Sequence, residues 1–410
     1  MKILHISAQK PDSTGSGIYL SGLIKGIGYS HKQALIVGID RYDDIEKTNE
    51  KFEGMVDIHP LIYNTEKLSF NLPGMSDNMP YKSTRYRDMD DNMTESMKRE
   101  FSKKLKEVVD LFEPDIIICH HLYFVTAITR EMYPEKKIVG ICHGTCMRQL
   151  QTNRFMNEYI KRHISKLDMI FSLHQKQKED IQKFFDIEPR KVKVLGSGYD
   201  SGMFFVVDEK KNSSEKIRIS YAGKLSFSKG LIEFIKALNN LSYNKNELEV
   251  VMIGDGSIDI EKNAILEEAS KCKYEIKFLG RVEQSILAEE LNKSDVFVLP
   301  SYYEGLPLVI LEAMACGNYI ICTDIEGVSQ WLGEEINNSG LIDYIDLPKM
   351  KSIGVPFETE KKQYIKRLSK GIEKAIDYRK KNRYEYIDIK SLSWKNLGIK
   401  LLDIFQSIEN

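Results

Sequence analysis

The chain has 410 residues, of which 42% are hydrophobic and 29% are charged, and its formal net charge is −1. This composition is ordinary for a soluble globular protein, and the length predicts two or three domains whose cores are large enough to fold without disulfides. Because the charge is nearly balanced and neither half of the chain is strongly basic, the composition excludes a typical nucleic-acid-binding protein.

Short apolar runs alternate with helical patterns along the first half of the chain, which indicates buried parallel strands separated by helices. Each run ends in Gly, Ser, His or Asp, as strands do when functional loops follow their carboxyl ends. The predicted strands of this half are MKILHIS, QALIVGI, DIIICHH, KIVGICHG, MIFSLH and KVKVLGSG.

A second series of strands follows in the other half, so we expect two doubly wound α/β domains. Helical stretches such as SGLIKGI and KGLIEFIKALNNL fall between the strands. An amphipathic helix is expected at about residues 391–410 and must dock on a domain to bury its apolar face, which consists of Trp394, Leu397, Leu401 and Phe405. The predicted strands of this half are RISYAGK, EVVMIGDG, IKFLGRV, VFVLPS and NYIICTD.

The seam between the two series is expected at residues 206–216, VVDEKKNSSEK, which are charged and have no periodicity. The predicted domains are therefore residues 1–205 and residues 206–390. A second aperiodic stretch, LSFNLPGMSDNMPYKSTRYRDMDDN, lies between residues 60 and 100. A structureless stretch of this length inside an α/β domain is often a functional loop or a lid.

The stretch YYEGLPLVILEAMACG, residues 302–317, places Glu304 in a loop after a strand and Glu312 inside the helix that follows. The amino end of this helix offers free N–H groups and a positive dipole, which suit a phosphate. A nucleotide sugar matches this layout, with its diphosphate on the helix and its sugar and ribose hydroxyls on the two acids. The alternative is a helix with two solvent-facing acids.

A second stretch, YAGKLSFSKGL, places Lys224 and Lys229 in the loop after the first strand of the second domain. Two ammonium groups beside a glycine-bearing turn can hold a diphosphate, whereas solvated surface lysines are the plainer interpretation. The lysines and the acids follow strands of one predicted sheet, so one ligand could contact both pairs.

These motifs resemble those of the retaining, GT-B-fold glycosyltransferases of family 4 (group 1) along nearly the whole chain. GKLSFSKG resembles the phosphate-binding loop, VMIGDGS and IKFLGRV the next two strand ends, and PSYYEGLPLVILEAMACG the E-x7-E motif. VLGSGYDSGMF resembles the segment before the interdomain linker, and STGSGIYLSGL the glycine-rich loop of the first domain. The resemblance implies two Rossmann-like domains facing a cleft, with the carboxyl-terminal helix returning to the first domain.

The resemblance also implies roles for single residues. Glu304 would bind the hydroxyls of the donor sugar, Glu312 would bind the ribose, and Lys229 would neutralise the diphosphate with help from Lys224. Lys224 stands where the family usually has arginine, so this position keeps the charge and loses the bidentate fork. Further contacts to the donor are implied for four residues around the start of the helix: Gly305, Leu306, Leu308 and Val309. In the first domain, Gly15 and Gly17 would contact the donor, and the main chain of Arg281 and Val282 would contact its nucleotide base.

His143, in ICHGTCMRQL, matches the family histidine that faces the transferred sugar, and together with Glu304 and Lys229 it completes the expected catalytic set. A structural histidine is the alternative at this strand end. His120 and His121 read as structural, and Arg148 could assist either phosphate or acceptor. The resemblance implies transfer with retention. Because no residue is a clear covalent nucleophile, we expect the diphosphate to depart from, and the acceptor to attack, the same face of the sugar.

No cofactor or metal is expected beyond the nucleoside-diphosphate-sugar donor, with a UDP-sugar favoured. The DMDD of residues 88–91 resembles a metal-binding motif but reads as solvated turn residues. Cys142 and Cys146 flank His143 without a second pair at zinc spacing, which favours structural thiols. The acceptor would be a hydroxyl of a glycan, a lipid-linked sugar or a protein in bacterial-type glycan synthesis. We expect the GMSDNMPY stretch of residues 74–81 to be part of the acceptor site or a lid.

The first residues are too polar for a signal peptide and no apolar run approaches a membrane span, so a cytoplasmic protein is expected. The basic stretch of residues 98–109 reads as a solvated helix face, with a peripheral contact at the inner membrane face as the alternative. Two other functions remain open. An NAD(P)-dependent oxidoreductase would need glycine where the chain has Leu20, and a silent nucleotide-sugar-binding protein would keep the fold without turnover.

Overall fold

The computed structural model describes residues 1–11, 13–43, 45–77, 79–207, 216–256, 258–382 and 385–409. The chain divides into two compact units: Met1–Gly198 with Trp394–Asn410 form unit 1, and Tyr199–Ser393 form unit 2. The expected boundary after residue 205 is therefore too late. Tyr199 already donates its N–H to the carbonyl of Leu392 (3.3 Å), and Phe204 is buried in the core of unit 2. Most of the expected seam, residues 208–215, lies outside the described residues.

Unit 1 is built on a seven-stranded sheet in which every neighbouring pair is parallel, in the order β3-β2-β1-β6-β7-β8-β9. All six strands predicted for this half are present, and β3 was not predicted. The strands are β1 (Lys2–Ser7), β2 (Lys32–Asp40), β3 (Asp57–Tyr63), β6 (Ile116–His120), β7 (Lys137–Ile141), β8 (Met169–Ser172) and β9 (Val192–Val194), with the short pair β4 (Pro73–Gly74) and β5 (Thr84–Arg85) outside the sheet.

Helices cover both faces of this sheet because its strands carry apolar side chains on both faces. On β2, for example, Leu35 and Val37 pack against α1, whereas Ala34 and Ile36 lie in the larger core on the other side. The helices of unit 1 are α1 (Gly15–Ile27), α2 (Ile45–Glu50), α3 (Asp91–Phe112), α4 (Phe124–Met132), α5 (Thr145–Thr152), α6 (Asn157–Ile164), α7 (Gln175–Phe185) and α14 (Trp394–Glu409).

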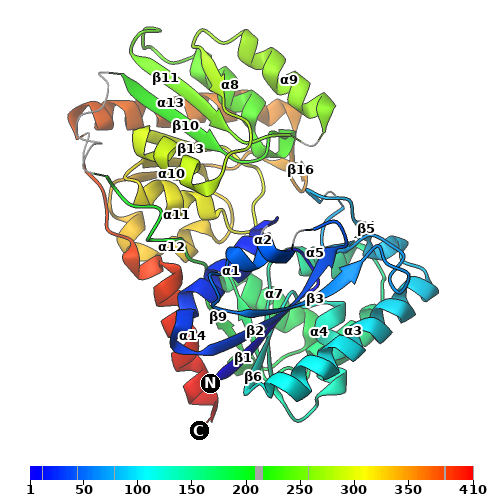
Figure 1. Ribbon diagram of the computed structural model, residues 1–410. Helices are drawn as coiled ribbons and strands as arrows, with labels where there is room; N and C mark the ends of the chain where they lie inside the picture. Colours follow the sequence, from blue (N-terminus) through cyan, green and yellow to red (C-terminus); the bar gives the residue numbers. More distant parts are fainter. Residues whose placement is uncertain are drawn as a thin grey trace. The chain divides into compact units, whose positions relative to one another are not determined.

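The carboxyl-terminal helix α14 belongs to unit 1, as predicted, and lies along α1 (Figure 1). Its apolar face is buried, with Leu401 and Phe405 at most 1% exposed. Glycines let the two helices approach: a Cβ on Gly22 would lie 2.2 Å from the Trp394 ring, and one on Gly26 would lie 2.1 Å from the Trp394 carbonyl oxygen. The C-terminal segment is therefore an integral part of the unit 1 fold.

The aperiodic stretch between residues 60 and 100 is only partly a loop. Helix α3 begins at Asp91, and the carboxylate of Asp90 caps it by accepting the N–H of Met93 (2.8 Å). Asp88 pairs with Arg85, so two acids of the DMDD motif have structural roles. The apolar face of α3 is buried in the unit 1 core, which leaves the charged face of residues 98–109 outside.

Unit 2 contains a six-stranded parallel sheet in the Rossmann order β12-β11-β10-β13-β14-β15. The five predicted strands are present, and β15 is additional. The strands are β10 (Ile217–Ala222), β11 (Leu248–Ile253), β12 (Ile276–Phe278), β13 (Val296–Leu299), β14 (Tyr319–Thr323) and β15 (Ile342–Ile345), with a small antiparallel pair β16 (Met350–Ser352) and β17 (Val355–Pro356).

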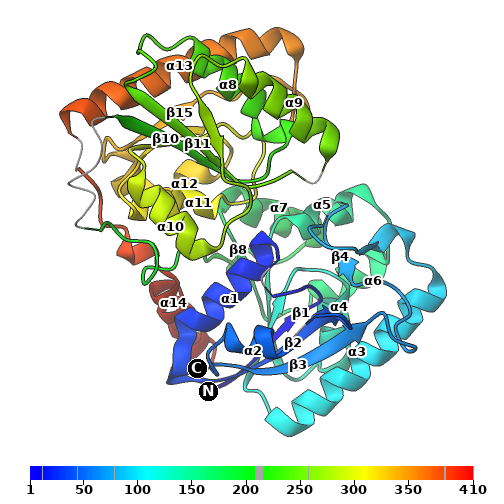
Figure 2. The same ribbon diagram turned by 45° about the horizontal axis from the view of Figure 1, so that its top comes forward.

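Helices also cover both faces of the second sheet, with α8 and α13 packed together on one face and α10 and α11 on the other (Figure 2). The predicted helix KGLIEFIKALNNL corresponds to α8. The helices are α8 (Leu231–Asn239), α9 (Asp259–Ser270), α10 (Gln284–Lys293), α11 (Leu308–Ala315), α12 (Val328–Asn337) and α13 (Glu358–Lys381). Among the described residues, no helix is both long and apolar enough to cross a membrane.

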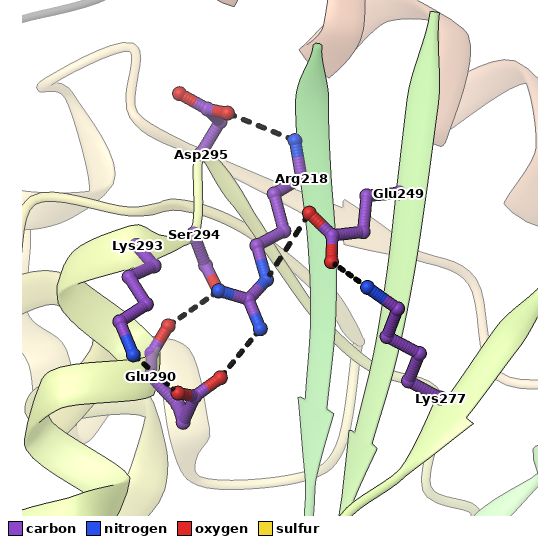
Figure 3. Close-up of polar contacts among 7 residues, drawn as sticks. All are labelled: Arg218, Glu249, Lys277, Glu290, Lys293, Ser294 and Asp295. Atoms are coloured by element: carbon purple, nitrogen blue, oxygen red, sulfur yellow. Dashed lines mark hydrogen bonds and ion pairs between the residues drawn. The ribbon is translucent and has the colours of Figure 1, made fainter. Parts of the chain in front are cut away.

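An ion-pair network ties α10 to the amino ends of β10 and β11 (Figure 3). The guanidinium of Arg218 lies between Glu290 of α10 and Glu249 of β11. The carboxylate of Asp295 accepts a hydrogen bond from the main-chain N–H of Arg218 at 2.9 Å. Burial opposes ionisation of Glu290, but Lys293 and Arg218 outweigh it and hold its pKa below the ordinary value. The network lies at the opposite end of the strands from the loops described next, so its role is structural.

Candidate functional site

The candidate site of unit 2 lies at the carboxyl ends of β10 and β13. These neighbouring strands form the topological switch point of the sheet, because the chain continues from β10 to one side and returns through β13 on the other. Open α/β sheets bind ligands at such a point, since the loops after the two strands diverge there. Lys224 and Lys229 follow β10, and Glu304 follows β13.

Lys229 and Glu304 form an ion pair across the switch point, with Nζ and Oε1 2.6 Å apart. The same carboxylate oxygen accepts a hydrogen bond from the Ser301 hydroxyl (2.7 Å). Both side chains are largely shielded, with 19% and 16% exposed. The structure thus brings together two residues that the sequence placed in separate motifs, and it adds Ser301, which the sequence analysis did not single out.

The loop that carries the lysines is shaped by close backbone contacts that require glycine. Gly230, which ends the 3-10 turn Phe227–Lys229, has φ +64°, and a Cβ there would lie 2.1 Å from the carbonyl oxygen of Pro300. Gly254 has φ +128°, and a Cβ there would lie 1.9 Å from the carbonyl oxygen of Gly223. These contacts hold the loops after β10, β11 and β13 against one another.

Glu312 lies on α11, which follows the Glu304 loop, and its side chain is 7% exposed. Burial raises the pKa of this carboxyl to about 7, and the negative charge of Asp200 adds to the shift. Among the described residues, none donates a hydrogen bond to the Glu312 carboxylate. A buried acid of this kind can accept hydrogen bonds from hydroxyl groups of a ligand without first losing a protein partner.

The other residues predicted for donor binding in unit 2 lie on the same edge of the sheet. The main-chain carbonyl of Lys224 accepts the Tyr221 hydroxyl (2.8 Å), and its side chain is half-buried. Arg281 is exposed and Val282 half-buried in the loop after β12, whose Gly280 carbonyl accepts the N–H of Gly254. The turn and first helical residues between the two acids are exposed or half-buried: Gly305, Leu306, Leu308 and Val309.

In unit 1, the switch point is between β1 and β6, and the predicted glycine-rich segment follows β1. Gly15 and Gly17 are not in an open loop as the resemblance implied; they form the first turn of α1, where the Thr14 hydroxyl caps the Gly17 N–H (3.2 Å). Gln9 connects this turn to β6, because its Oε1 accepts from the Ser16 hydroxyl and from His121 Nε2, both at 3.1 Å.

His143, the predicted catalytic histidine, lies after β7 and is buried among other histidines. Its Nε2 is 3.2 Å from Nδ1 of His120, and its ring centroid is 4.7 Å from that of His121. Burial and the neighbouring His121 and His120 rings hold the pKa of His143 well below its usual value, so the ring is neutral near pH 7. His120 and His121 are therefore neighbours of the candidate residue, which their positions in the sequence did not indicate.

The hydrogen bond between His120 and His143 favours one tautomer of each ring. The Nε2 atom of His120 is buried and has no partner among the described residues. If that atom carried the proton, a buried N–H would lack an acceptor; with the proton on Nδ1, the N–H donates to His143. His143 then accepts at Nε2 and carries its own proton on Nδ1, where it can donate to a ligand.

Helix α1 supports His143 from the side. The ring of Tyr19 meets the His143 ring edge-on, with centroids 4.9 Å apart, and packs against Trp394 of α14 at 5.0 Å. The Tyr19 hydroxyl donates to the carbonyl of Gly196 (3.1 Å). The docking of α14 therefore bears on the position of the predicted catalytic histidine.

The remaining sequence candidates do not form a metal centre. The sulfurs of Cys142 and Cys146 are 3.5 Å apart and both thiols are buried. Arg148 is exposed on α5. No group of three or more His, Cys, Asp or Glu side chains in the described part of the chain has the arrangement of a metal site.

Several known proteins that resemble this chain are named as glycosyltransferases. A protein of Methanocaldococcus jannaschii described as an uncharacterized glycosyltransferase is 25% identical over 59% of this chain and 65% of its own length. The UDP-Gal:alpha-D-GlcNAc-diphosphoundecaprenol alpha-1,3-galactosyltransferase of Escherichia coli is 30% identical over 38% of this chain and 43% of its own. The chain thus matches less than two thirds of the length of either relative.

The fold is that of the GT-B glycosyltransferases, with two Rossmann-like domains. The crystal structure of Anabaena Alr3699/HepE in complex with UDP and glucose superposes with a TM-score of 0.63 at 13% identity and covers 99% of this chain and 100% of its own. Two family models match in tandem: Glycosyltransferase Family 4 over residues 83–202, and Glycosyl transferases group 1 over residues 205–342. The chain belongs to the group 1 glycosyltransferases of family 4.

Proposed function

We propose that the protein transfers a sugar from a nucleoside diphosphate sugar to an acceptor hydroxyl, with retention at the anomeric carbon, in the synthesis of a glycan. The observation that carries this proposal is the 2.6 Å pair of Lys229 and Glu304 at the switch point of unit 2. A cation and an acid side by side at this position suit a ligand in which a diphosphate is attached to a sugar.

In the proposed reaction, the diphosphate takes Lys229 as a counterion and the hydroxyls of the transferred sugar donate to Glu304. Lys224 and the amino end of α11 stabilise the negative charge that grows on the leaving diphosphate, which is electrostatic catalysis. The acceptor hydroxyl attacks on the face from which the diphosphate departs and gives its proton to the leaving phosphate oxygen. His143, Gly15 and Gly17 keep the roles predicted for them, and Glu312 is assigned to the ribose.

A UDP-sugar is the favoured donor. The name of the E. coli relative specifies UDP-Gal as its donor, and the Anabaena structure contains UDP and glucose. The base itself would be bound through the main chain near Arg281 and Val282, so side chains at this position do not select it.

The test is the slow hydrolysis of an α-linked UDP-sugar, followed by proton NMR of the first sugar released. Retention predicts that the α anomer is released before it equilibrates, whereas inversion would give the β anomer first. Glu304→Gln should still bind the donor and lose at least 100-fold in hydrolysis, about 2.7 kcal/mol of transition-state stabilisation. Full activity of Glu304→Gln would show that Glu304 is not part of the site. Donor binding without turnover in the wild-type protein would favour a nucleotide-sugar-binding protein that has no catalytic activity.

A further inference from the structure

Unit 1 contains a cavity of about 610 Å³ at the carboxyl ends of β1, β2 and β3. Lys10 follows β1, Asp40 is the last residue of β2, and Asn64 follows β3. The loop after β2 and the loop after β3 supply the rest of the lining: Arg41, Tyr42 and Asp43 from the first, and Thr65, Ser69, Asn71, Tyr81 and Lys82 from the second. The volume lies within the range of small-molecule sites. The carboxyl edge of the sheet is also where such sites form in α/β domains.

The acids of this cavity are occupied by protein donors. Asp40 accepts the N–H of Tyr42 (3.1 Å) and the side-chain amide of Asn64. Asp43 accepts the N–H of Asp40 (2.7 Å) and the ammonium of Lys10 (2.5 Å). Both carboxylates are thus committed to building the cavity wall, and the charge of Lys10 is neutralised within it.

Two further cations line the cavity without a carboxylate partner among the described residues: Arg41 and Lys82. The guanidinium of Arg41 is held in place by Tyr42, since it stacks 4.6 Å from the ring centroid and donates to the hydroxyl. Three cations and two carboxylates line the cavity, so the formal charge of its lining is +1. Arginine and lysine in this situation suit a carboxylate or phosphate group, which arginine binds with two parallel hydrogen bonds.

The rest of the lining suits the body of a saccharide. Tyr42 is 75% exposed, and Tyr81 lies beside Lys10, whose ammonium is 5.2 Å from the Tyr81 ring centroid. Two amide side chains, Asn64 and Asn71, and two hydroxyl side chains, Thr65 and Ser69, also belong to the lining. Aromatic surface with a few convergent polar groups binds a ligand that has both an apolar face and hydroxyls, as a pyranose does.

We propose that this cavity binds an anionic saccharide, one that carries a carboxylate or a phosphate group, and that this saccharide is the acceptor. The role as acceptor rests on the proposed function, whereas the binding of an anionic saccharide does not. The stretch of residues 74–81, predicted as acceptor site or lid, contributes Tyr81. The charged groups of the lining are Lys10 after β1, Asp40 at the end of β2, Arg41 and Asp43 in the loop after it, and Lys82.

The experiment is a binding titration by NMR on the full chain, without nucleotide sugar, using D-glucuronate, D-glucose 6-phosphate and D-glucose as probes. At least one anionic probe should bind about tenfold or more tightly than glucose. Tighter binding of D-glucuronate would indicate a carboxylate site, and tighter binding of D-glucose 6-phosphate would indicate a phosphate site. The double variant Arg41→Gln/Lys82→Gln should lose this preference. Arg190→Gln, which removes an exposed arginine elsewhere in unit 1, should keep it.

Equal binding of glucose and of both anionic probes, binding of no probe, or an unchanged preference in the double variant would each overturn the proposal. Transfer is then measured by mass spectrometry with a UDP-sugar and the bound anionic probe. A product that forms in the wild-type protein and falls about tenfold or more in the double variant supports the acceptor role. Donor hydrolysis that persists in the double variant separates a failure of this cavity from a failure of the proposed function.

Discussion

The charge of Glu312, a candidate site residue, depends strongly on its surroundings. Burial raises its pKa to about 7, with Asp200 adding to the shift. Because this value lies above the ordinary pKa of about 4.3 in an unfolded chain, the folded chain holds a proton that the unfolded chain has lost between these two pH values. The stabilising contribution is therefore complete below about pH 4 and is lost as the pH rises through about 7.

Replacing the buried acid with its neutral isostere should remove this pH dependence. Glu312→Gln is expected to be more stable than the wild-type protein at pH 8, by up to about 4 kcal/mol, and to show no such gain at pH 4. Urea denaturation of the full chain at the two pH values, followed through the unfolding of unit 2, measures the difference in the free energy of unfolding. Glu267→Gln on the exposed surface of α9 is the control, and a gain of equal size at both pH values would contradict the assigned pKa.

Donor binding should change the protonation of Glu312. Ribose hydroxyls that donate to the carboxylate favour its ionised form, so UDP binding near pH 7 should release a fraction of a proton. Calorimetric titration in two buffers of different ionisation enthalpy measures this release. Glu312→Gln should abolish it, and proton uptake by the wild-type protein would contradict the ribose assignment.

His120 is expected to set the tautomer of His143. With ¹⁵N-labelled histidine, the ring nitrogens of His143 should show the proton on Nδ1 in the wild-type protein, because His120 donates to Nε2. His120→Asn keeps an N–H near the Nδ1 position and should preserve this tautomer, whereas His120→Leu should lose it. His163, a buried histidine on α6, should be unchanged in both variants. A proton on His143 Nε2 in the wild-type protein would contradict the assignment.

At the residue scale, the sequence predicted side chains within motifs better than contacts between motifs. Lys229 and Glu304 were both identified, because each follows a buried strand. The contacts of Gln9 and His121 were not predictable, since they depend on how the loops after β1 and β6 meet at the switch point. The signal that the sequence offered was the pair His120 and His121 at the end of a predicted central strand, where a ligand site is expected.

At the element scale, the central strands of both sheets were predictable because strands covered on both faces are continuously apolar. The strands that were missed in the two main sheets lie at sheet edges: β3 contains Pro60 and half-exposed residues, and β15 is short and contains the half-buried Asp343. The start of α3 was missed because Asp90 and Asp91 read as a turn. An acid at such a position can equally cap a helix, as Asp90 does.

The contact between α1 and α14 depends on glycine. Alanine in place of Gly26 would favour the helix by its propensity, but its Cβ would lie 2.1 Å from the Trp394 carbonyl oxygen. Gly26→Ala is therefore expected to lower the free energy of unfolding by about 2 kcal/mol, as overpacking against backbone does. Urea denaturation tests this, with Lys25→Ala on the same helix as the control. Equal or greater stability of Gly26→Ala would contradict the observed packing.

At the scale of the whole molecule, the chain consists of two doubly wound units, each with a candidate ligand site at the carboxyl edge of its sheet. Unit 2 has the lysines and glutamates assigned to the donor, and unit 1 has the histidine cluster and the cavity assigned to the acceptor. This proposed division of labour is compatible with the fold, because ligand sites in α/β units form at the carboxyl edge of the parallel sheet and each unit has such an edge. Helix α14 follows unit 2 in the sequence but packs in unit 1. Truncation at residue 393 should therefore destabilise unit 1, which contains His143.

The most direct test of the central claim is a thermal-shift measurement with UDP-, GDP- and ADP-sugars, with NAD and NADP as controls. A ligand at 100 times its dissociation constant stabilises the folded chain by about 2.7 kcal/mol, which is readily detected. We expect stabilisation by a UDP-sugar that is lost in Lys229→Ala and kept in Lys271→Ala, which alters an exposed lysine of the same unit. Stabilisation by NAD alone, or by a nucleotide sugar equally in Lys229→Ala, would contradict the assignment of the donor site.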